Sequence, residues 1–154
     1  MQGTPQTESR IHRRLIDTLY VDAMVLADEA RGYFDEGGRV DRERLDPLAR
    51  VSFSCESLKV TTRLMHVIAW LLTQRAVQAG ELAARDALDP SRRLGPAPLS
   101  DAAATAAMPK TARALIESSM ELHRRVAIID DAQAGTRPPS RAVRSLQERL
   151  ATAF

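Results

Sequence analysis

The sequence predicts an all-α protein built as an antiparallel three-helix bundle with long helices. Apolar residues recur at alternating steps of three and four along three long segments, which is the spacing of one face of a helix. The sequence has no alternating apolar and polar runs and no Asn-Gly hairpin turns, so nothing in it predicts a sheet. With 44% apolar residues in 154, the chain can form an ordinary hydrophobic core without disulfides or metals.

The first helix is expected over residues 8–36. Thr7 or Ser9 can cap its start, and Gly37-Gly38 is expected to end it with a left-handed cap. Its apolar face is a single stripe with the members Leu15, Leu19, Ala23, Leu26, Ala30 and Tyr33. A short connection then leads to the second helix.

The second helix is expected from Asp46-Pro47 to Gly80, because aspartate is a good N-cap and proline fits the first helical position. An unbroken heptad pattern predicts the stripe that faces the core. The members of this stripe are Leu48, Val51, Cys55, Leu58, Thr62, Met65, Ala69, Leu72 and Ala76. A further stripe of Val60, Leu64, Val67 and Leu71 makes the C-terminal half apolar on most sides, so we expect this helix to contact more than one neighbour.

Residues 80–108 contain three prolines and are expected to form a long mobile loop between the second and third helices. The third helix is expected from Pro109 to Gly135. Its core stripe has the members Met108, Ala112, Leu115, Ser119, Leu122, Val126 and Ile129. The predicted bundle domain therefore covers residues 8–135.

Residues 136–154 are expected to form a flexible or partner-docking C-terminal tail. Pro138-Pro139 stops any helix, and a short amphipathic helix is expected after it, over residues 141–154. A helix of this length is marginal alone in water, so it docks on its own bundle or waits for a partner. Its apolar face is the candidate anchor for a partner's groove and has the members Val143, Leu146, Leu150 and Phe154.

The sequence offers no arrangement typical of an active site or a metal centre. His12, His66 and His123 fall on different predicted helices, and no His-Glu-x-x-His motif is present. Cys55 is the single cysteine, which excludes an internal disulfide, and its place on the core stripe predicts a buried, inert thiol. We therefore expect no catalytic residue, no cofactor and no metal.

Four residues of the second helix are candidate contacts for a second copy of the chain or for another partner: Arg63, Trp70, Gln74 and Arg75. Tryptophan and arginine are the commonest anchors of protein interfaces. A single tryptophan on a bundle helix is nevertheless more often part of the core. On the same helix, Glu56, Lys59 and Arg63 share one face and predict a ladder of ion pairs within the helix.

Charge and hydropathy predict a cytoplasmic protein that does not enter a membrane. The first ten residues are polar and lack the apolar region of a signal peptide. The longest strongly apolar run is about half of the roughly 20 residues that a bilayer span needs. The formal net charge is only +2, and the four arginines within residues 137–149 are more typical of a solvated helix face than of a nucleic-acid site. A DNA-associated regulator that uses these arginines stays open as an alternative.

A small all-helical enzyme is a second alternative. Residues 13–17, Arg-Arg-Leu-Ile-Asp, faintly resemble the first helix of all-helical chorismate mutases. Such an enzyme needs several converging Arg or Lys side chains around a substrate with two carboxylates. The matching spacing of Lys, Glu and Gln is not found convincingly further along the sequence.

Residues 56–77 resemble the signature of the regulator of CtrA degradation (RcdA) family of alphaproteobacteria. The motifs that carry this resemblance are Thr61-Thr62-Arg63-Leu64-Met65, Trp70-Leu71-Leu72 and Gln74-Arg75-Ala76, supported by Leu19-Tyr20, Ala23-Met24, Ser119, Leu122 and Arg125. The resemblance covers about residues 10–134. It implies a three-helix bundle that forms a homodimer, and a non-enzymatic adaptor that helps to deliver cell-cycle regulatory proteins to the ClpX–ClpP protease.

Overall fold

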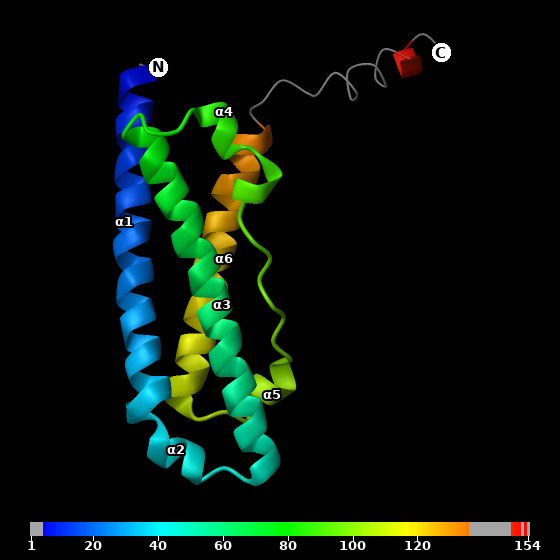
Figure 1. Ribbon diagram of the computed structural model, residues 1–154. Helices are drawn as coiled ribbons and strands as arrows, with labels where there is room; N and C mark the ends of the chain where they lie inside the picture. The colour runs from blue at the N-terminus through cyan, green and yellow to red at the C-terminus, as the bar shows by residue number, and fades with distance from the viewer. Residues whose placement is uncertain (1–4, 136–148, 152, 154) are drawn as a thin grey trace.

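The computed structural model describes residues 5–135, 149–151 and 153. Every regular element within these residues is helical, which confirms the predicted class. Three long helices dominate: α1 (Pro5–Gly32), α3 (Pro47–Gln78) and α6 (Lys110–Gly135). They lie side by side, with α3 in contact with both of the others (Figure 1).

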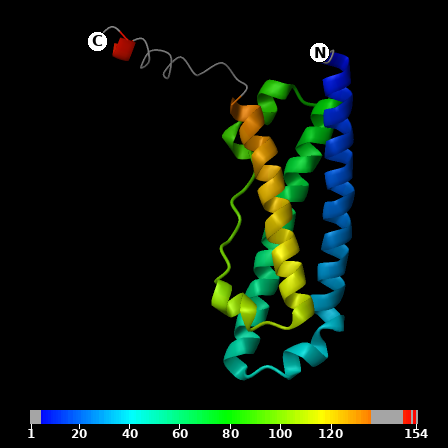
Figure 2. The ribbon, with the colours of Figure 1, turned by 180° about the vertical axis from the view of Figure 1, so that it is seen from behind.

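The direction of α6 differs from the prediction. α1 is antiparallel to both other long helices, but α3 and α6 run parallel, so a fully antiparallel bundle is wrong (Figure 1). Arg63 of α3 bonds to Ser119 of α6, and further along both helices Trp70 bonds to Asp130. The parallel arrangement is possible because residues 79–109 return along the whole bundle before α6 begins (Figure 2).

That returning connection is held against the bundle, whereas the sequence predicts a mobile loop. It contains α4 (Ala84–Ala87), a 3-10 turn (Pro90–Arg92) and α5 (Ala102–Ala106). Between the turn and α5 runs an extended segment, residues 93–101, which we call the strap. Side chains of α3 and α6 bind the strap by hydrogen bonds, which supply the order that its own sequence does not predict.

The corner between α1 and α3 contains a π-helical turn (Tyr33–Gly37) and the short α2 (Arg39–Glu43). The predicted left-handed cap is wrong, because Gly38 has φ −91°. Glycine is needed there for a different reason. A Cβ atom on Gly38 would lie 2.8 Å from the Tyr33 carbonyl oxygen and 2.9 Å from the Tyr33 ring.

The ends of α3 follow the prediction. Asp46 caps the start, since its Oδ1 accepts a hydrogen bond of 2.8 Å from the Ala49 amide, and Pro47 occupies the first helical position. Gly80 follows the last turn with φ +76°, in the left-handed region where glycine is favoured. Local signals therefore set both boundaries of this helix.

The core confirms the predicted stripe of the third helix but not that of the second. Six of the seven predicted residues on α6 and just before it are buried: Met108, Ala112, Leu115, Ser119, Leu122 and Val126. On α3 the buried apolar residues are instead Phe53, Val60, Leu64, Val67, Trp70 and Leu71. The two stripes of α3 lie on opposite sides of the helix, so only one can face α1 and α6. The buried stripe is the one with Val60, Leu64, Val67 and Leu71, which lies on the same side of α3 as the aromatic residues Phe53 and Trp70.

Among the helices in the described part of the chain, none combines the length and the hydropathy that a bilayer crossing requires.

The close approach at Gly38 predicts a stability difference between two adjacent glycines. We expect Gly38→Ala to lower the free energy of unfolding by about 1–3 kcal/mol, because the new methyl group meets backbone that has little room to move. Gly37→Ala is the matched control, since its Cβ would lie 3.5 Å from the Gly32 carbonyl oxygen, an ordinary contact. Urea denaturation followed by circular dichroism measures both, and equal midpoints would contradict this role of Gly38.

Candidate functional site

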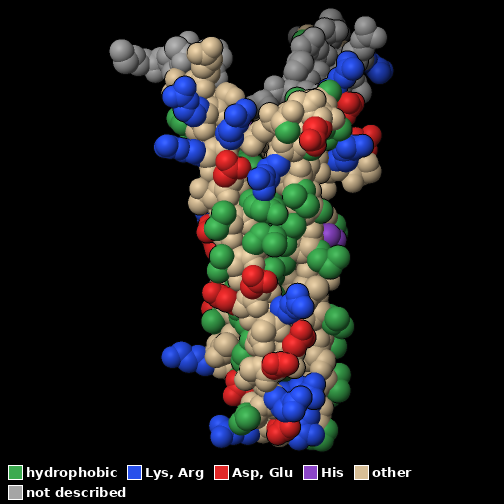
Figure 3. All heavy atoms as spheres, turned by 60° about the vertical axis from the view of Figure 1, so that its left-hand side comes forward, with side chains coloured by type: hydrophobic (Ala, Val, Ile, Leu, Met, Phe, Trp, Pro, Cys, Tyr) green, Lys and Arg blue, Asp and Glu red, His purple; other side chains and the backbone are tan. Residues whose placement is uncertain are grey.

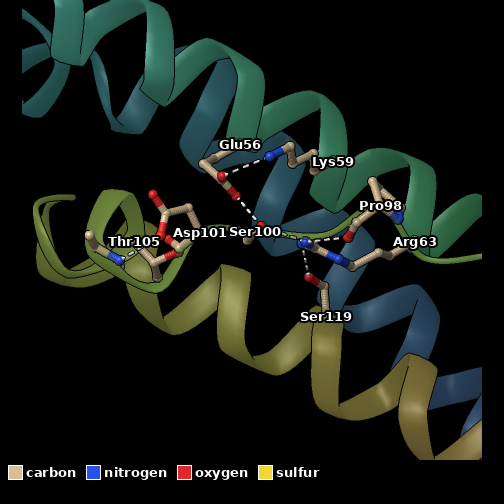
Figure 4. A network of polar contacts seen from close by, with 9 residues as sticks. Glu56, Lys59, Arg63, Pro98, Ser100, Asp101, Thr105 and Ser119 are labelled. Carbon is tan, nitrogen blue, oxygen red and sulfur yellow. Dashed lines mark hydrogen bonds and ion pairs between the residues drawn. The ribbon is translucent and has the colours of Figure 1, made fainter.

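Arg63 is fully buried where α3, α6 and the strap meet. Its guanidinium donates hydrogen bonds to the Pro98 carbonyl oxygen (2.9 Å), to Ser100 Oγ (2.6 Å) and to Ser119 Oγ (3.3 Å) (Figure 4). Burial lowers the pKa of the Arg63 guanidinium, and the charge of Glu56 opposes that shift. The side chain therefore joins two helices and the strap.

Glu56 supplies the opposite charge about two turns before Arg63 on α3. It is 3% exposed and accepts a 2.6 Å hydrogen bond from the Ser100 hydroxyl on Oε2. Lys59 Nζ lies 3.3 Å from Oε1 of the same carboxylate (Figure 4). The predicted ladder thus forms between Glu56 and Lys59, while Arg63 turns to the strap.

Two histidines hold adjacent carbonyl groups of the strap. His66 Nδ1 donates to the Pro96 carbonyl oxygen at 2.9 Å, and His123 Nε2 donates to the Gly95 carbonyl oxygen at 2.8 Å. A Cβ atom on Gly95 would lie 2.6 Å from the His66 ring, so the strap needs glycine where it passes this residue. Through these two hydrogen bonds the strap is bound to both α3 and α6.

Trp70 and Asp130 form a second buried polar contact between α3 and α6. The Trp70 indole Nε1 donates to Asp130 Oδ1 at 3.0 Å, and the two residues are 2% and 5% exposed. Arg93 at the start of the strap donates to both oxygens of the same carboxylate, at 2.8 and 2.9 Å. The carboxylate is therefore compensated by a charge from the strap.

Gln133 links Gln74 of α3 to His12 of α1 near the end where α3 finishes. Gln133 Nε2 of α6 donates to Gln74 Oε1 at 3.0 Å and lies 3.4 Å from His12 Nε2 of α1. Burial lowers the pKa of His12, which favours the neutral ring that this contact needs as an acceptor.

Three of the four predicted partner contacts are therefore enclosed within the protomer. Arg63, Trp70 and Gln74 are buried and engaged with the protein's own elements, so they offer no surface to a partner. Arg75 is exposed; its guanidinium lies 4.5 Å above the Tyr20 ring and 4.0 Å from an Asp17 oxygen. The prediction of one surface made by these four residues is corrected on this point, because the apolar side of α3 that carries Trp70 faces inward.

The outer side of α3 carries the apolar surface instead. The heptad stripe that the sequence predicts as core faces solvent, and we call it the α3 stripe. Its exposed members are Leu48, Val51, Cys55, Leu58, Met65, Ala69 and Leu72, with Thr62 and Ala76 half-buried between them. Cys55 is thus exposed, in contrast to the predicted buried thiol. A continuous exposed apolar stripe of this length is typical of a protein interaction site.

An apolar groove of about 250 Å³ adjoins the α3 stripe on the side of α1. Its lining includes Ala27 and Ala30 of α1, Phe34 of the π-helical turn, and Leu64, Met65 and Ile68 of α3. Hydrophobic side chains gather in the middle of this face, between charged groups toward both ends (Figure 3). Met65 belongs to both features, so the groove and the stripe form one surface.

The predicted tail anchor falls almost entirely outside the described residues. Val143, Leu146 and Phe154 lie there, as do three of the four tail arginines. Leu150 is described and is 54% exposed. Within the described residues, no group of three or more His, Cys, Asp or Glu side chains is placed to hold a metal ion.

Sequence reasoning missed the partners of the buried polar residues. Ser100, Arg93 and Asp130 carry the strap network, yet they lie in segments interpreted as a loop and as a solvated helix. The available signal was the length of the connection, since more than twenty residues are enough to run back along a bundle. Pairing individual side chains across that distance requires the structure.

The sequence matches a family model over residues 7–154; the family is described as a protein of unknown function, DUF1465. Among solved structures, the chain is similar to RcdA from Caulobacter crescentus CB15. The two share 31% sequence identity with a TM-score of 0.63, over 77% of this chain and 90% of that one. No curated protein sequence matches this chain significantly.

The Arg63 network predicts that replacing Arg63 causes a large loss of stability, part of which a second substitution restores. We expect Arg63→Met to lower the free energy of unfolding by about 3 kcal/mol, because Glu56 is left buried with less compensation. Adding Glu56→Gln should recover part of that loss, since the uncompensated charge is then gone. Arg75→Met is the control and should cost less than about 1 kcal/mol, as its ion pair is exposed. Denaturant unfolding measures the stability of each variant. If the stability changes caused by Arg63→Met and Glu56→Gln simply add up in the double variant, the two residues are not coupled.

The environment of His12 predicts a stability that falls in mild acid. Above about pH 6.5 the imidazole is neutral in both the folded and the unfolded chain. Below that pH the unfolded chain binds a proton that the folded protein resists, because burial lowers the folded-state pKa, so stability is lost as the pH falls. His12→Gln should therefore have a shallower decline between pH 7 and 5 than the unmodified chain. Superimposable pH profiles of the two proteins would disprove the role of His12.

Proposed function

This chain belongs to the DUF1465 family and is similar to RcdA over most of its length, and from this membership we propose that it is a non-enzymatic adaptor of regulated proteolysis in the bacterial cell cycle. In this role it tethers cargo proteins to the ClpX–ClpP protease, together with associated adaptor proteins. We further propose that it acts in the cytoplasm as a homodimer.

The observation that carries this proposal, beside the family itself, is the separation of polar and apolar groups. The buried polar side chains Arg63, Trp70, Gln74 and Asp130 are engaged with the protein's own helices and strap. The α3 stripe and the adjoining groove together form an elongated apolar surface on two helices. A surface of this kind supports binding to proteins, which is what an adaptor requires.

Tethering explains how such a protein accelerates degradation without any chemistry of its own. An adaptor that holds cargo and protease together raises the effective concentration of cargo at the protease. The helical body, residues 8–135, is proposed to bind one partner. The tail, residues 136–154, is proposed as a separate unit that engages another partner through Val143, Leu146, Leu150 and Phe154.

The proposal predicts that protein lifetimes in the cell depend on this chain. Deleting its gene should lengthen the half-lives of a set of proteins, and depleting ClpX should lengthen the half-lives of the same proteins. Half-lives are measured by quantitative mass spectrometry after translation is stopped. Reintroducing the full chain should restore them. If no ClpX-dependent half-life changes on deletion, the adaptor function is wrong.

The same assay separates the role of the tail from that of the body. A variant with serine in place of the four tail anchor residues should fail to restore the half-lives. A control with serine in place of Arg141 and Glu148, on the other face of the predicted tail helix, should restore them. Full restoration by the first variant would remove the tail from the mechanism and leave the adaptor role intact.

A further inference from the structure

The strap has the backbone conformation of a polyproline II helix. At its two ends Arg93 has φ −68° and ψ 161°, and Asp101 has φ −70° and ψ 127°. Between them Pro96 and Pro98 have φ fixed by their rings at about −65°. A residue that precedes a proline is held to extended backbone, which applies to Ala97. A polyproline II helix has about three residues per turn and no internal hydrogen bonds.

Side-chain exposure along the strap repeats every three residues, as this conformation requires. Leu94, Ala97 and Ser100 are half-buried. Pro96 and Leu99 are exposed, and Leu99 is 88% exposed, the highest value among the large apolar side chains that the structure describes. A β-strand would repeat every two residues and place Ala97 and Leu99 on one face. The period of three instead places Pro96 and Leu99 together on an outward edge.

The strap is held in this conformation by the bundle itself. Hydrogen bonds with side chains of α3 and α6 hold five of its residues: Arg93, Gly95, Pro96, Pro98 and Ser100. The segment runs in this state along the side of the bundle (Figure 1). A binding segment that is already ordered loses little conformational entropy when it associates with a partner.

Two residues of the strap keep their backbone groups free. In the described part of the chain, neither the amide nor the carbonyl oxygen of Ala97 or Leu99 has a hydrogen-bond partner. Such carbonyl groups can accept hydrogen bonds from a partner protein. Tryptophan and tyrosine side chains supply donors of this kind at the edge of an apolar ring.

We propose that Pro96, Leu99 and the free carbonyl groups of the strap form a docking site for a partner protein whose groove is lined by aromatic side chains. Grooves of this kind recognise polyproline II segments. A sheet edge is the other surface that binds extended segments, and the three-residue period of the strap disfavours it. This inference rests on the proposed function, which makes other proteins the ligands of this chain, and it adds a second binding surface to the α3 stripe.

Photocross-linking in living cells identifies the partner and the surface that it uses. In the full-length chain, p-benzoylphenylalanine replaces Ala103, an exposed residue of α5 directly after the strap. The control carries it in place of Ile128, which is 58% exposed on α6. We expect the first position, but not the control, to link to another protein at a groove lined by Trp, Tyr or Phe. A link to a sheet edge, links only within the chain itself, or no specific link would overturn the inference.

Titration of the purified partner with the full-length chain measures the contribution of Leu99. Leu99→Ser should weaken binding by about 10-fold or more, because an apolar side chain that the complex buries is lost. Ile128→Ser is the matched control and should bind as the unmodified chain does. Both variants should unfold at the same urea concentration as the unmodified chain, since both side chains are largely exposed. Equal affinities of the two variants would refute the docking site.

The half-life assay separates the failure of this inference from the failure of the proposed function. In cells that lack the gene, Leu99→Ser should leave at least one of the affected half-lives long, whereas Ile128→Ser should restore all of them. Full restoration by Leu99→Ser would overturn the docking site and leave the adaptor role intact. If deletion of the gene changes no half-life, the adaptor role is wrong, and the cross-link and the titration still decide whether the strap binds a partner.

Discussion

The guanidinium of Arg63 lies where α3, α6 and the strap meet, and the course of the chain depends on how that charge is compensated. A buried cation is tolerated only with close polar partners. Two of those partners, the Pro98 carbonyl and the Ser100 hydroxyl, belong to the strap. Compensating the charge therefore also fixes the path by which the connection returns along the bundle. That path allows α6 to start at the same end as α3 and to run parallel to it.

This arrangement divides α3 into an inner and an outer side with different tasks. The inner side holds the aromatic and polar residues that join α1, α6 and the strap. The outer side carries the α3 stripe and has no neighbour in the described part of the chain. Because the contacts that maintain the fold lie on the inner side, a partner can bind the outer side without competing with them. This separation suits the proposed adaptor role, in which the protein remains folded with and without cargo.

Local signals predicted the helices well but could not assign their faces. The boundaries of α3 followed from Asp46-Pro47 and Gly80, and the buried face of α6 followed from its apolar spacing. On α3 two apolar stripes compete, and periodicity alone does not say which one faces the protein's own core. The sequence pattern predicts the heptad stripe as core although it is the exposed one, since a pattern that fits a partner looks the same as a pattern that fits the core.

The candidate site was harder to predict, because it depends on contacts between residues distant in sequence. Arg63, Trp70 and Gln74 stood out by residue type, but their partners Ser100, Asp130 and Gln133 did not. The parallel course of α6 brings these pairs together, and the sequence of a chain with three long helices does not predict that course. Once that course is known, each pairing follows from the need to satisfy a buried polar group.

The parallel course of α6 also determines where the two ends of the described bundle emerge. In an alternating three-helix bundle the first helix begins and the third helix ends at opposite poles. Here Pro5 and Gly135 lie at the same pole (Figure 1). A fluorescent protein or affinity handle fused ahead of α1 would therefore crowd whatever follows α6. The opposite pole, where α2 turns the chain, offers an insertion point that keeps such a label away from both ends.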